Sequence, residues 1–182
     1  GSEDRTVKVW EAESGRLLHS LEGHTGWVRA VAVSSNGHWI ASGSDDRTVK
    51  VWEAESGRLL RSLEEHTAVV NALAVSPDGR WIVSGSDDHT VKVWEAESGR
   101  LLRSLEGHKW AVNTVAVSLD GRFIVSGSDD RTVKVWEAES GRLLRSLGEH
   151  TGWVKAVAVS PDGRFIVSGA DDHTIRAWNL ES

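Results

Sequence analysis

Short apolar runs separated by turn residues follow one another along the whole chain. In the first full copy of the pattern, the runs cover 28–34, 39–43, 48–52 and 58–63, and they are rich in Val, Ile and Trp. Runs of this length, bounded by Gly, Ser, Asp and Asn, favour β-strands over helices. The first turn reads Ser35-Asn36-Gly37 and becomes Pro77-Asp78-Gly79 and Pro161-Asp162-Gly163 in later copies, which suits tight hairpins. The pattern predicts an antiparallel meander of four strands.

The first run of each copy is apolar at nearly every position, and not only at alternate positions. Residues 28–34 read VRAVAVS, and 154–160 read VKAVAVS. A strand that is apolar on both sides is typical of a sheet covered on both faces. We therefore expect the sheets to stack face to face.

The pattern repeats every 42 residues without an insertion. The period is marked by a tryptophan series and a histidine series, Trp10, Trp52, Trp94, Trp136, Trp178 and His24, His66, His108, His150. The segment TVKVWEAESGRLLRSL is identical from Thr48, Thr90 and Thr132, and the copy from Thr6 differs only at His19. A repeat of this length is one supersecondary unit that buries its apolar faces only against its neighbours. One copy alone should not fold.

The Gly-His start, the Ser-Gly-Ser-x-Asp-x-Thr segment and the tryptophan-ended third strand resemble the WD-repeat β-propeller family over the whole chain. The copies depart from the family pattern in having Trp52-Glu53 and Trp178-Asn179 in place of Trp-Asp, and Glu65 and Glu149 before two of the histidines. The resemblance implies an all-β fold of four-stranded propeller blades, about four per chain. Blades this similar to one another resemble recently amplified bacterial WD arrays, or an engineered fragment of one.

On this reading the chain is one propeller unit with five parts. Residues 1–22 supply a third and an outermost strand, three blades span 23–64, 65–106 and 107–148, and an incomplete blade of three strands spans 149–182.

The resemblance also implies that a His, a Ser, an Asp and a Trp in each blade form a buried hydrogen-bonded tetrad. The indole donates, the hydroxyl accepts and donates onward, the imidazole relays, and the carboxylate ends the chain of bonds. The four tetrads are His24, Ser42, Asp46, Trp52; His66, Ser84, Asp88, Trp94; His108, Ser126, Asp130, Trp136; and His150, Ser168, Asp172, Trp178.

Two chemical alternatives to a structural tetrad are weaker. A Ser, His and Asp together could serve a hydrolase, but four copies of one catalytic centre in one small protein would be extraordinary. The Asp87-Asp88-His89 run could hold a metal, but Arg47 and Arg131 replace the histidine in two copies. We therefore predict no enzyme activity, no cofactor and no metal.

The copies differ mainly just after the repeated histidine, where they read TGWVRAV, TAVVNAL, KWAVNTV and TGWVKAV. In a meander this loop emerges beside the loop between the second and third strands. Tryptophan beside arginine is typical of interface hot spots. We predict a protein-binding face there, formed by Trp27, Arg29, Asp45, Val69, Asn71, Asp87, Trp110, Asn113, Asp129, Trp153, Lys155 and Asp171. Neutral drift, or tryptophans that merely cap the gaps between blades, would also explain why these residues differ between the copies. The alternative function is a self-assembling structural fragment without a ligand of its own.

Four blades are too few for a well-packed ring. With sheets about 10 Å apart at the axis, the outer strands would diverge to about 32 Å in a ring of four blades, against about 21 Å in a ring of eight. Only leucines such as Leu17, Leu18 and Leu21 are available to fill that wedge. We therefore predict a homodimer that closes an eight-bladed ring, in which each chain lends the outer strand at 16–21 to the last blade of the other. Third-strand copies at 6–10 and 174–178 then compete for one place, and we favour the N-terminal copy.

Composition narrows the other possibilities. The net charge is −6 with both signs interspersed, so no basic stripe favours nucleic acid. No apolar stretch approaches the ~20 residues of a membrane helix, and no secretory leader is evident, which leaves the cytoplasm as the default location. The chain has no cysteine, which excludes disulfides and thiol chemistry.

Overall fold

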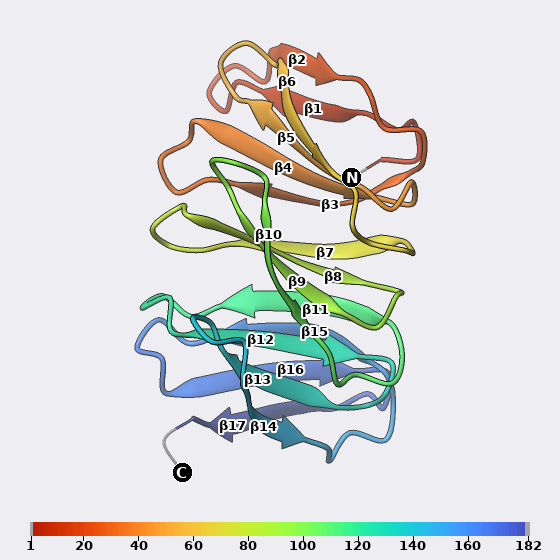
Figure 1. The fold of residues 1–182 in the computed structure, drawn as a ribbon, viewed down its shortest axis with the longest axis vertical. Coiled ribbons are helices and arrows are strands. Elements are labelled where there is room, and N and C mark those ends of the chain that lie inside the picture. Colours follow the sequence, from red (N-terminus) through yellow and green to blue (C-terminus); the bar gives the residue numbers. More distant parts are fainter. Residues whose placement is uncertain (1, 181–182) are drawn as a thin grey trace.

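The computed structural model describes residues 2–180, and in that range every regular element is a β-strand (Figure 1). The strands are β1 (Val7–Trp10), β2 (Leu17–Leu21), β3 (Val28–Val33), β4 (Trp39–Ser44), β5 (Val49–Glu53), β6 (Leu59–Leu63), β7 (Val70–Val75), β8 (Trp81–Ser86), β9 (Val91–Glu95), β10 (Leu101–Leu105), β11 (Val112–Val117), β12 (Phe123–Ser128), β13 (Val133–Glu137), β14 (Leu143–Leu147), β15 (Val154–Val159), β16 (Phe165–Ala170) and β17 (Ile175–Asn179).

These strands form five antiparallel sheets in chain order. Three sheets have four strands each, β3–β6, β7–β10 and β11–β14; the hairpin β1–β2 precedes them and the three strands β15–β17 follow. The prediction of an all-β chain built from four-stranded meanders is confirmed.

The strands begin and end close to the predicted limits, and the differences have local causes. The third strand starts at Val49 because the amide and hydroxyl of Thr48 both donate to the Asp46 carboxylate, at 3.0 and 2.7 Å, which keeps Thr48 in the turn. The first strand ends at Val33 because the Ser34 hydroxyl donates to Asn36 and accepts the Trp39 amide.

The core lies between successive sheets. Val49 and Val51 of β5 pack against Val70 of β7 and Trp94 of β9, and the same arrangement recurs at the next interface. In β9 and β13 the first four residues are buried, whichever face they point to. The sheets therefore stack face to face, as the apolar first strands predict.

A glycine in the second strand sets how closely adjacent sheets approach. A Cβ added to Gly43 would lie 2.7 Å from the Val70 side chain, and one added to Gly85 would lie 2.7 Å from that of Val112. Only glycine permits this contact without moving the neighbouring strand.

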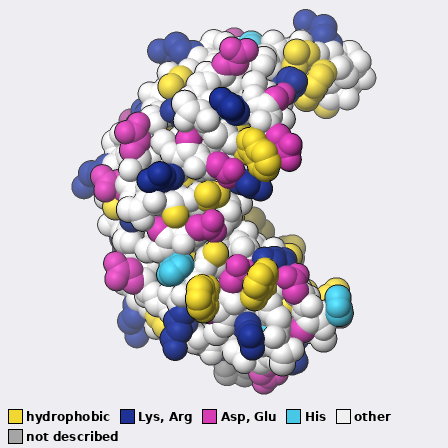
Figure 2. All heavy atoms as spheres, turned by 90° about the vertical axis from the view of Figure 1, so that its right-hand side faces the viewer, with side chains coloured by type: hydrophobic (Ala, Val, Ile, Leu, Met, Phe, Trp, Pro, Cys, Tyr) yellow, Lys and Arg dark blue, Asp and Glu magenta, His cyan; other side chains and the backbone are white. Residues whose placement is uncertain are grey.

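The described residues form an open crescent and not a ring closed by one chain (Figure 2). The hairpin β1–β2 lies at one end of the array and β15–β17 at the other (Figure 1). An open array agrees with the expectation that one chain does not close on itself.

Candidate functional site

The loop before the first strand lies beside the loop between the second and third strands in each sheet. The amide of Asp45 donates to the carbonyl of Trp27 at 2.9 Å, and Asp87 donates to Val69 in the same way. Asp129 and Asp171 repeat this bond with Ala111 and Trp153. The residues of the predicted binding face are therefore gathered on one side of the molecule.

Three tryptophans on this side are exposed, each next to a basic or imidazole group. The exposed fractions of Trp27, Trp110 and Trp153 are 42%, 62% and 51%. The Arg29 guanidinium lies 5.1 Å from the Trp27 ring centre and the Lys155 ammonium 4.7 Å from that of Trp153. Exposed indoles beside cations offer apolar area and charge together.

Three of the four aspartates on this side, Asp45, Asp87 and Asp129, are held by neighbouring side chains. Arg29 makes a two-bond contact with the Asp45 carboxylate, at 2.6 and 2.9 Å, and this contact raises the pKa of Arg29. Asn71 and Asn113 each donate to the aspartate of their own sheet at 2.6 Å, while Lys155 donates to Asp129 at 3.0 Å. The face is thus an ordered polar network.

Asn71 and Asn113 have a second role that the sequence did not indicate. Their amide groups also donate to the carbonyls of Val112 and Val154, which belong to the next sheet. Each asparagine therefore links two neighbouring sheets as well as lying on the candidate face.

Trp110 and Trp153 flank a hollow of about 470 Å³ between the last two sheets. Lys109, Asp129, Asp130 and Arg131 complete its lining. A second hollow of about 240 Å³ shares Arg131 and Trp153 with the first, and its other lining residues are Thr151, Gly152 and Asp171. Lys109 and Arg131 are not among the binding-face residues predicted from the sequence, although Lys109 is the one residue in its series that replaces threonine.

The side chains of each His–Ser–Asp–Trp set meet beneath this face. In the first sheet, Trp52 Nε1 donates to Ser42 Oγ, His24 Nε2 contacts the same oxygen, and His24 Nδ1 contacts Asp46, each at 2.8 Å. The equivalent bonds in the other three sets measure between 2.6 and 2.9 Å. Because the indole can only donate, the serine hydroxyl donates to Nε2, and Nδ1–H donates to the carboxylate.

Burial and hydrogen bonding fix the charges of the first set. Burial lowers the pKa of His24, although the Asp46 carboxylate opposes this effect. Burial raises the pKa of Asp46, but hydrogen bonds from Thr25, Thr48 and His24 outweigh it and lower the pKa to about 2. At neutral pH the histidine is therefore uncharged and the aspartate charged.

The serine of this set is not accessible to a substrate. Ser42 has an exposed fraction of 0%, Trp52 1% and His24 7%. The order Ser, His, Asp resembles that of a nucleophilic triad, but the hydroxyl is enclosed between the indole and the imidazole. The arrangement satisfies buried polar groups and offers no nucleophile to solvent.

The comparison with protein families identifies the repeat. The WD40 profile, described as "WD domain, G-beta repeat", matches residues 15–53, 57–95, 99–137 and 141–179. The chain belongs to the WD40 family. The sequence prediction of a WD-repeat protein is confirmed.

Curated WD-repeat relatives match over short segments. The chain is 56% identical over 43 residues to "Small ribosomal subunit protein RACK1y" of Oryza sativa subsp. japonica, which covers 24% of the chain and 13% of that protein. It is 49% identical over 37 residues to "Nuclear distribution protein PAC1" of Mycosarcoma maydis, covering 20% and 8%. It is 60% identical over 30 residues to "Probable serine/threonine-protein kinase PkwA" of Thermomonospora curvata, covering 16% and 4%. The chain thus matches only a small part of each relative.

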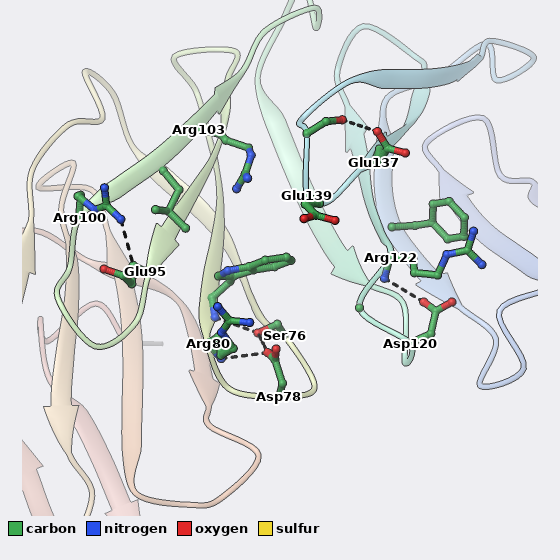
Figure 3. A pocket seen from close by; sticks show the side chains of 15 residues that line it. Ser76, Asp78, Arg80, Glu95, Arg100, Arg103, Asp120, Arg122, Glu137 and Glu139 are labelled. Atoms are coloured by element: carbon green, nitrogen blue, oxygen red, sulfur yellow. Dashed lines mark hydrogen bonds and ion pairs between the residues drawn. The ribbon is translucent and has the colours of Figure 1, made fainter.

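The opposite side of this WD40 array has a cavity that the sequence did not predict. It measures about 760 Å³ and lies between the sheets β7–β10 and β11–β14 (Figure 3). Phe123 lines it at the position where the two preceding blades have Trp39 and Trp81. Arg100 pairs with Glu95 at 3.7 Å, and the Arg103 guanidinium lies 6.0 Å from the Trp81 ring centre. Acidic and basic groups are thus mixed around this cavity.

Two further features are absent from residues 2–180. No helix there is long and apolar enough to cross a membrane. No group of three or more His, Asp or Glu side chains in that range is arranged to hold a metal ion.

Proposed function

We propose that this WD40 chain is a non-enzymatic platform that binds a protein or peptide at the face carrying Trp27, Trp110 and Trp153. The observation that carries the proposal is the hollow of about 470 Å³ between Trp110 and Trp153, two exposed indoles that line it together with Lys109 and Arg131. Such a hollow accepts an apolar side chain of a partner, and burial of that side chain supplies most of the affinity.

The charges around the hollow define the partner further. Lys109 and Arg131 line it, while Asp129 is already engaged by Asn113 and Lys155. A partner that carries a carboxylate next to its apolar side chain gains a favourable contact there. The proposal is therefore a peptide segment with an apolar residue beside an acidic one.

Selection from a random peptide library displayed on phage tests this proposal. Peptides selected on the unaltered chain should bind the Trp110→Ala, Trp153→Ala double variant about tenfold to hundredfold more weakly, because each truncation removes an exposed aromatic contact. Leu119→Ala is the matched control, since Leu119 is 63% exposed on the opposite side of the molecule. Peptides that bind both variants with unchanged affinity would contradict the proposed face.

A second proposal concerns self-association, and the exposure of the two end sheets favours it. Ile175 in β17 is 80% exposed and Val33 in β3 is 60% exposed, whereas their counterparts in the second complete blade, Val91 and Val75, are buried and half-buried. Two chains that close one eight-bladed ring, each lending the outer strand Leu17–Leu21 to the last blade of the other, would cover both ends.

Mass measurement by light scattering tests this second proposal. We expect a particle of twice the 19.9 kDa chain mass. A particle of one chain mass at micromolar concentration would refute the ring and leave the binding face untouched.

A further inference from the structure

The last sheet presents an uncovered core face. Ile175 is 80% exposed, whereas Val49, Val91 and Val133, which occupy the same position in the other blades, have exposed fractions of 0%. Val167 is 39% exposed, although its counterparts Ala41, Val83 and Val125 are also at 0%. The residues of this face thus occupy positions that a neighbouring sheet covers in the other blades.

The glycine at the centre of this face shows what shape would fit it. Gly85 is approached by the side chains of Val112 and Val115 from the next sheet, at 2.7 and 3.1 Å from an added Cβ. Gly169 holds the same position in the last sheet and has nothing within 4 Å. The residues that correspond to Val112 and Val115 in the first complete blade are Val28 and Val31.

The first complete blade exposes part of the complementary surface, because Val28 is already buried against the N-terminal hairpin while Val31 is not. Val31 is 45% exposed, whereas Val115 at the same position is 8% exposed. The uncovered face around Gly169 in β16 and the exposed side chain of Val31 in β3, here called the ridge, lie at opposite ends of the array. Their sheets do not touch in one chain (Figure 1). A second copy of this chain carries the matching surface at each end.

The N-terminal segment is already folded as the outer half of a blade. The amide and hydroxyl of Thr6 donate to Asp4 at 3.0 and 2.7 Å, the same lengths as the Thr48 bonds to Asp46. Arg5 has a φ of 68°, close to the 71° of Arg47. Val7 and Leu21 are buried against the first complete blade.

This half-blade carries two tetrad residues without their partners. Asp4 and Trp10 precede Asp46 and Trp52 by one period of 42 residues. The ring of Trp10 is 56% exposed, whereas Trp52 is 1% exposed. The histidine and serine of such a blade would come from strands of the first and second type, which β15 and β16 provide.

We propose that each shared blade of the two-chain ring combines β15 and β16 of one copy with β1 and β2 of the other. Asp4 and Trp10 of one copy then complete a tetrad with His150 and Ser168 of the other, and β17 is displaced. This arrangement rests on the two-chain ring proposed above. It specifies which strands form the shared blade at each junction between the two chains, and we call this junction the seam.

Side-chain packing against the next blade favours β1 over β17 as the third strand of the shared blade. Both strands bring a tryptophan to the serine, since Trp178 donates to Ser168 at 2.8 Å in one chain. Toward the next blade, however, β1 presents Val7 and Val9, whereas β17 presents Ile175 and Ala177. The other blades have buried valines at the second position, so Ala177 leaves space unfilled there.

The connection to the outer strand favours β1 as well. β1 and β2 are joined by a tight turn in which the Gly15 amide donates to the Glu11 carbonyl at 2.9 Å. Seating β17 would require β1 to leave its place on the first complete blade, where Val7 is buried. β1 therefore enters the shared blade together with β2.

Engineered cysteine pairs distinguish the two strands, because the chain has no cysteine of its own. Trp39 lies opposite Glu53 in a pair that exchanges no hydrogen bonds, since Ser34 donates to Trp39 and Glu53 donates to Arg58. Such pairs are close enough for a disulfide. The equivalent pairs are Glu11 with Phe165 between copies, and Phe165 with Asn179 within one chain.

The Glu11→Cys, Phe165→Cys variant should form a covalent dimer on oxidation, seen on a non-reducing gel. The matched Phe165→Cys, Asn179→Cys variant should remain reduced. A dimer in which only the second variant oxidises would overturn the displacement of β17 and leave the ring intact. A particle of one chain mass, or a Glu11→Cys, Phe165→Cys disulfide within a single chain, would overturn the ring as well.

Hydrogen exchange of the unaltered protein independently tests which of the two strands occupies the shared blade. The amides of 7–10 should be protected and those of 175–179 should exchange at least tenfold faster. The reverse order of protection would overturn the proposed seam.

Discussion

At the scale of single residues, the tetrad serine occupies the most constrained position in the blade. Ser126 accepts from Trp136 Nε1 at 2.9 Å and lies 2.8 Å from His108 Nε2, with an exposed fraction of 0%. Its one oxygen satisfies two buried groups that have no route to water. A buried donor or acceptor left without a partner costs about 1–3 kcal/mol.

Replacing this serine should therefore destabilise the protein without removing any binding contact. Ser126→Ala should lower the free energy of unfolding by about 1–3 kcal/mol, because it leaves the indole and the imidazole unpaired. Urea unfolding followed by tryptophan fluorescence measures this change. Ser35→Ala, at an exposed turn position, is the control and should change the value by less than about 0.5 kcal/mol. Equal effects of the two changes would show that the tetrad contributes nothing to stability.

At the scale of elements, the loop between the second and third strands depends on an unusual backbone conformation. Arg47, Arg131, His89 and His173 all have φ between 63° and 71°. The aspartate before each of them accepts bonds from the threonine after it, which holds the chain in this left-handed turn. A residue with a side chain pays for this conformation with about 1–2 kcal/mol.

Substitutions at Arg47 test this strain. Arg47→Val should destabilise the protein by about 1–3 kcal/mol, because a β-branched residue is poorly accommodated at positive φ. Arg47→Gly should be nearly neutral, since relief of strain offsets the greater freedom of the unfolded chain. Thermal unfolding of both variants provides the comparison. Similar melting temperatures for the two would mean that the turn relaxes to another conformation.

The same loops show which parts of the structure the sequence can predict. The period of 42 residues places His24, Ser42, Asp46 and Trp52 at fixed positions in each copy, so the blade and its side-by-side loops follow from pattern and turn residues. The positive φ at Arg47 does not follow, because arginine gives no turn signal; it results from the bonds of Asp46 with Thr48. The sequence pattern therefore predicts the repeated blade well, but it does not predict a backbone conformation that side-chain hydrogen bonds impose on a residue such as Arg47.

The hollows were beyond prediction for a different reason. The cavity beside Phe123 and the hollow between Trp110 and Trp153 depend on how two neighbouring blades differ in side-chain volume. The sequence shows each difference, but the resulting space depends on the distance and angle between sheets. Lys109 and Arg131 acquire their place on the candidate face only through that geometry.

At the scale of the whole molecule, the two ends of the crescent are the surfaces through which the proposed two-chain ring would form. Blades that are alike in sequence differ in burial according to whether another sheet covers them; Val31 at 45% exposure and Val115 at 8% are one example. The free energy available from covering such surfaces is about 25 cal/mol per Å² of apolar area. In the proposed two-chain ring, association would therefore be driven by the same kind of contacts that hold neighbouring blades together.

A charge placed on the exposed ridge should separate the chains without unfolding them. Val31→Asp leaves the single chain folded, because Val31 is already 45% exposed there, but the proposed seam would bury the carboxylate beside Gly169 without a partner. Such burial costs several kcal/mol, which weakens association by at least about a hundredfold. Light scattering across a dilution series should then give one chain mass, whereas Leu119→Asp, at an equally apolar but outward-facing turn, should keep the mass of two chains. If Val31→Asp also kept the mass of two chains, the ridge at Val31 would lie outside the interface and the chains would have to meet through another surface.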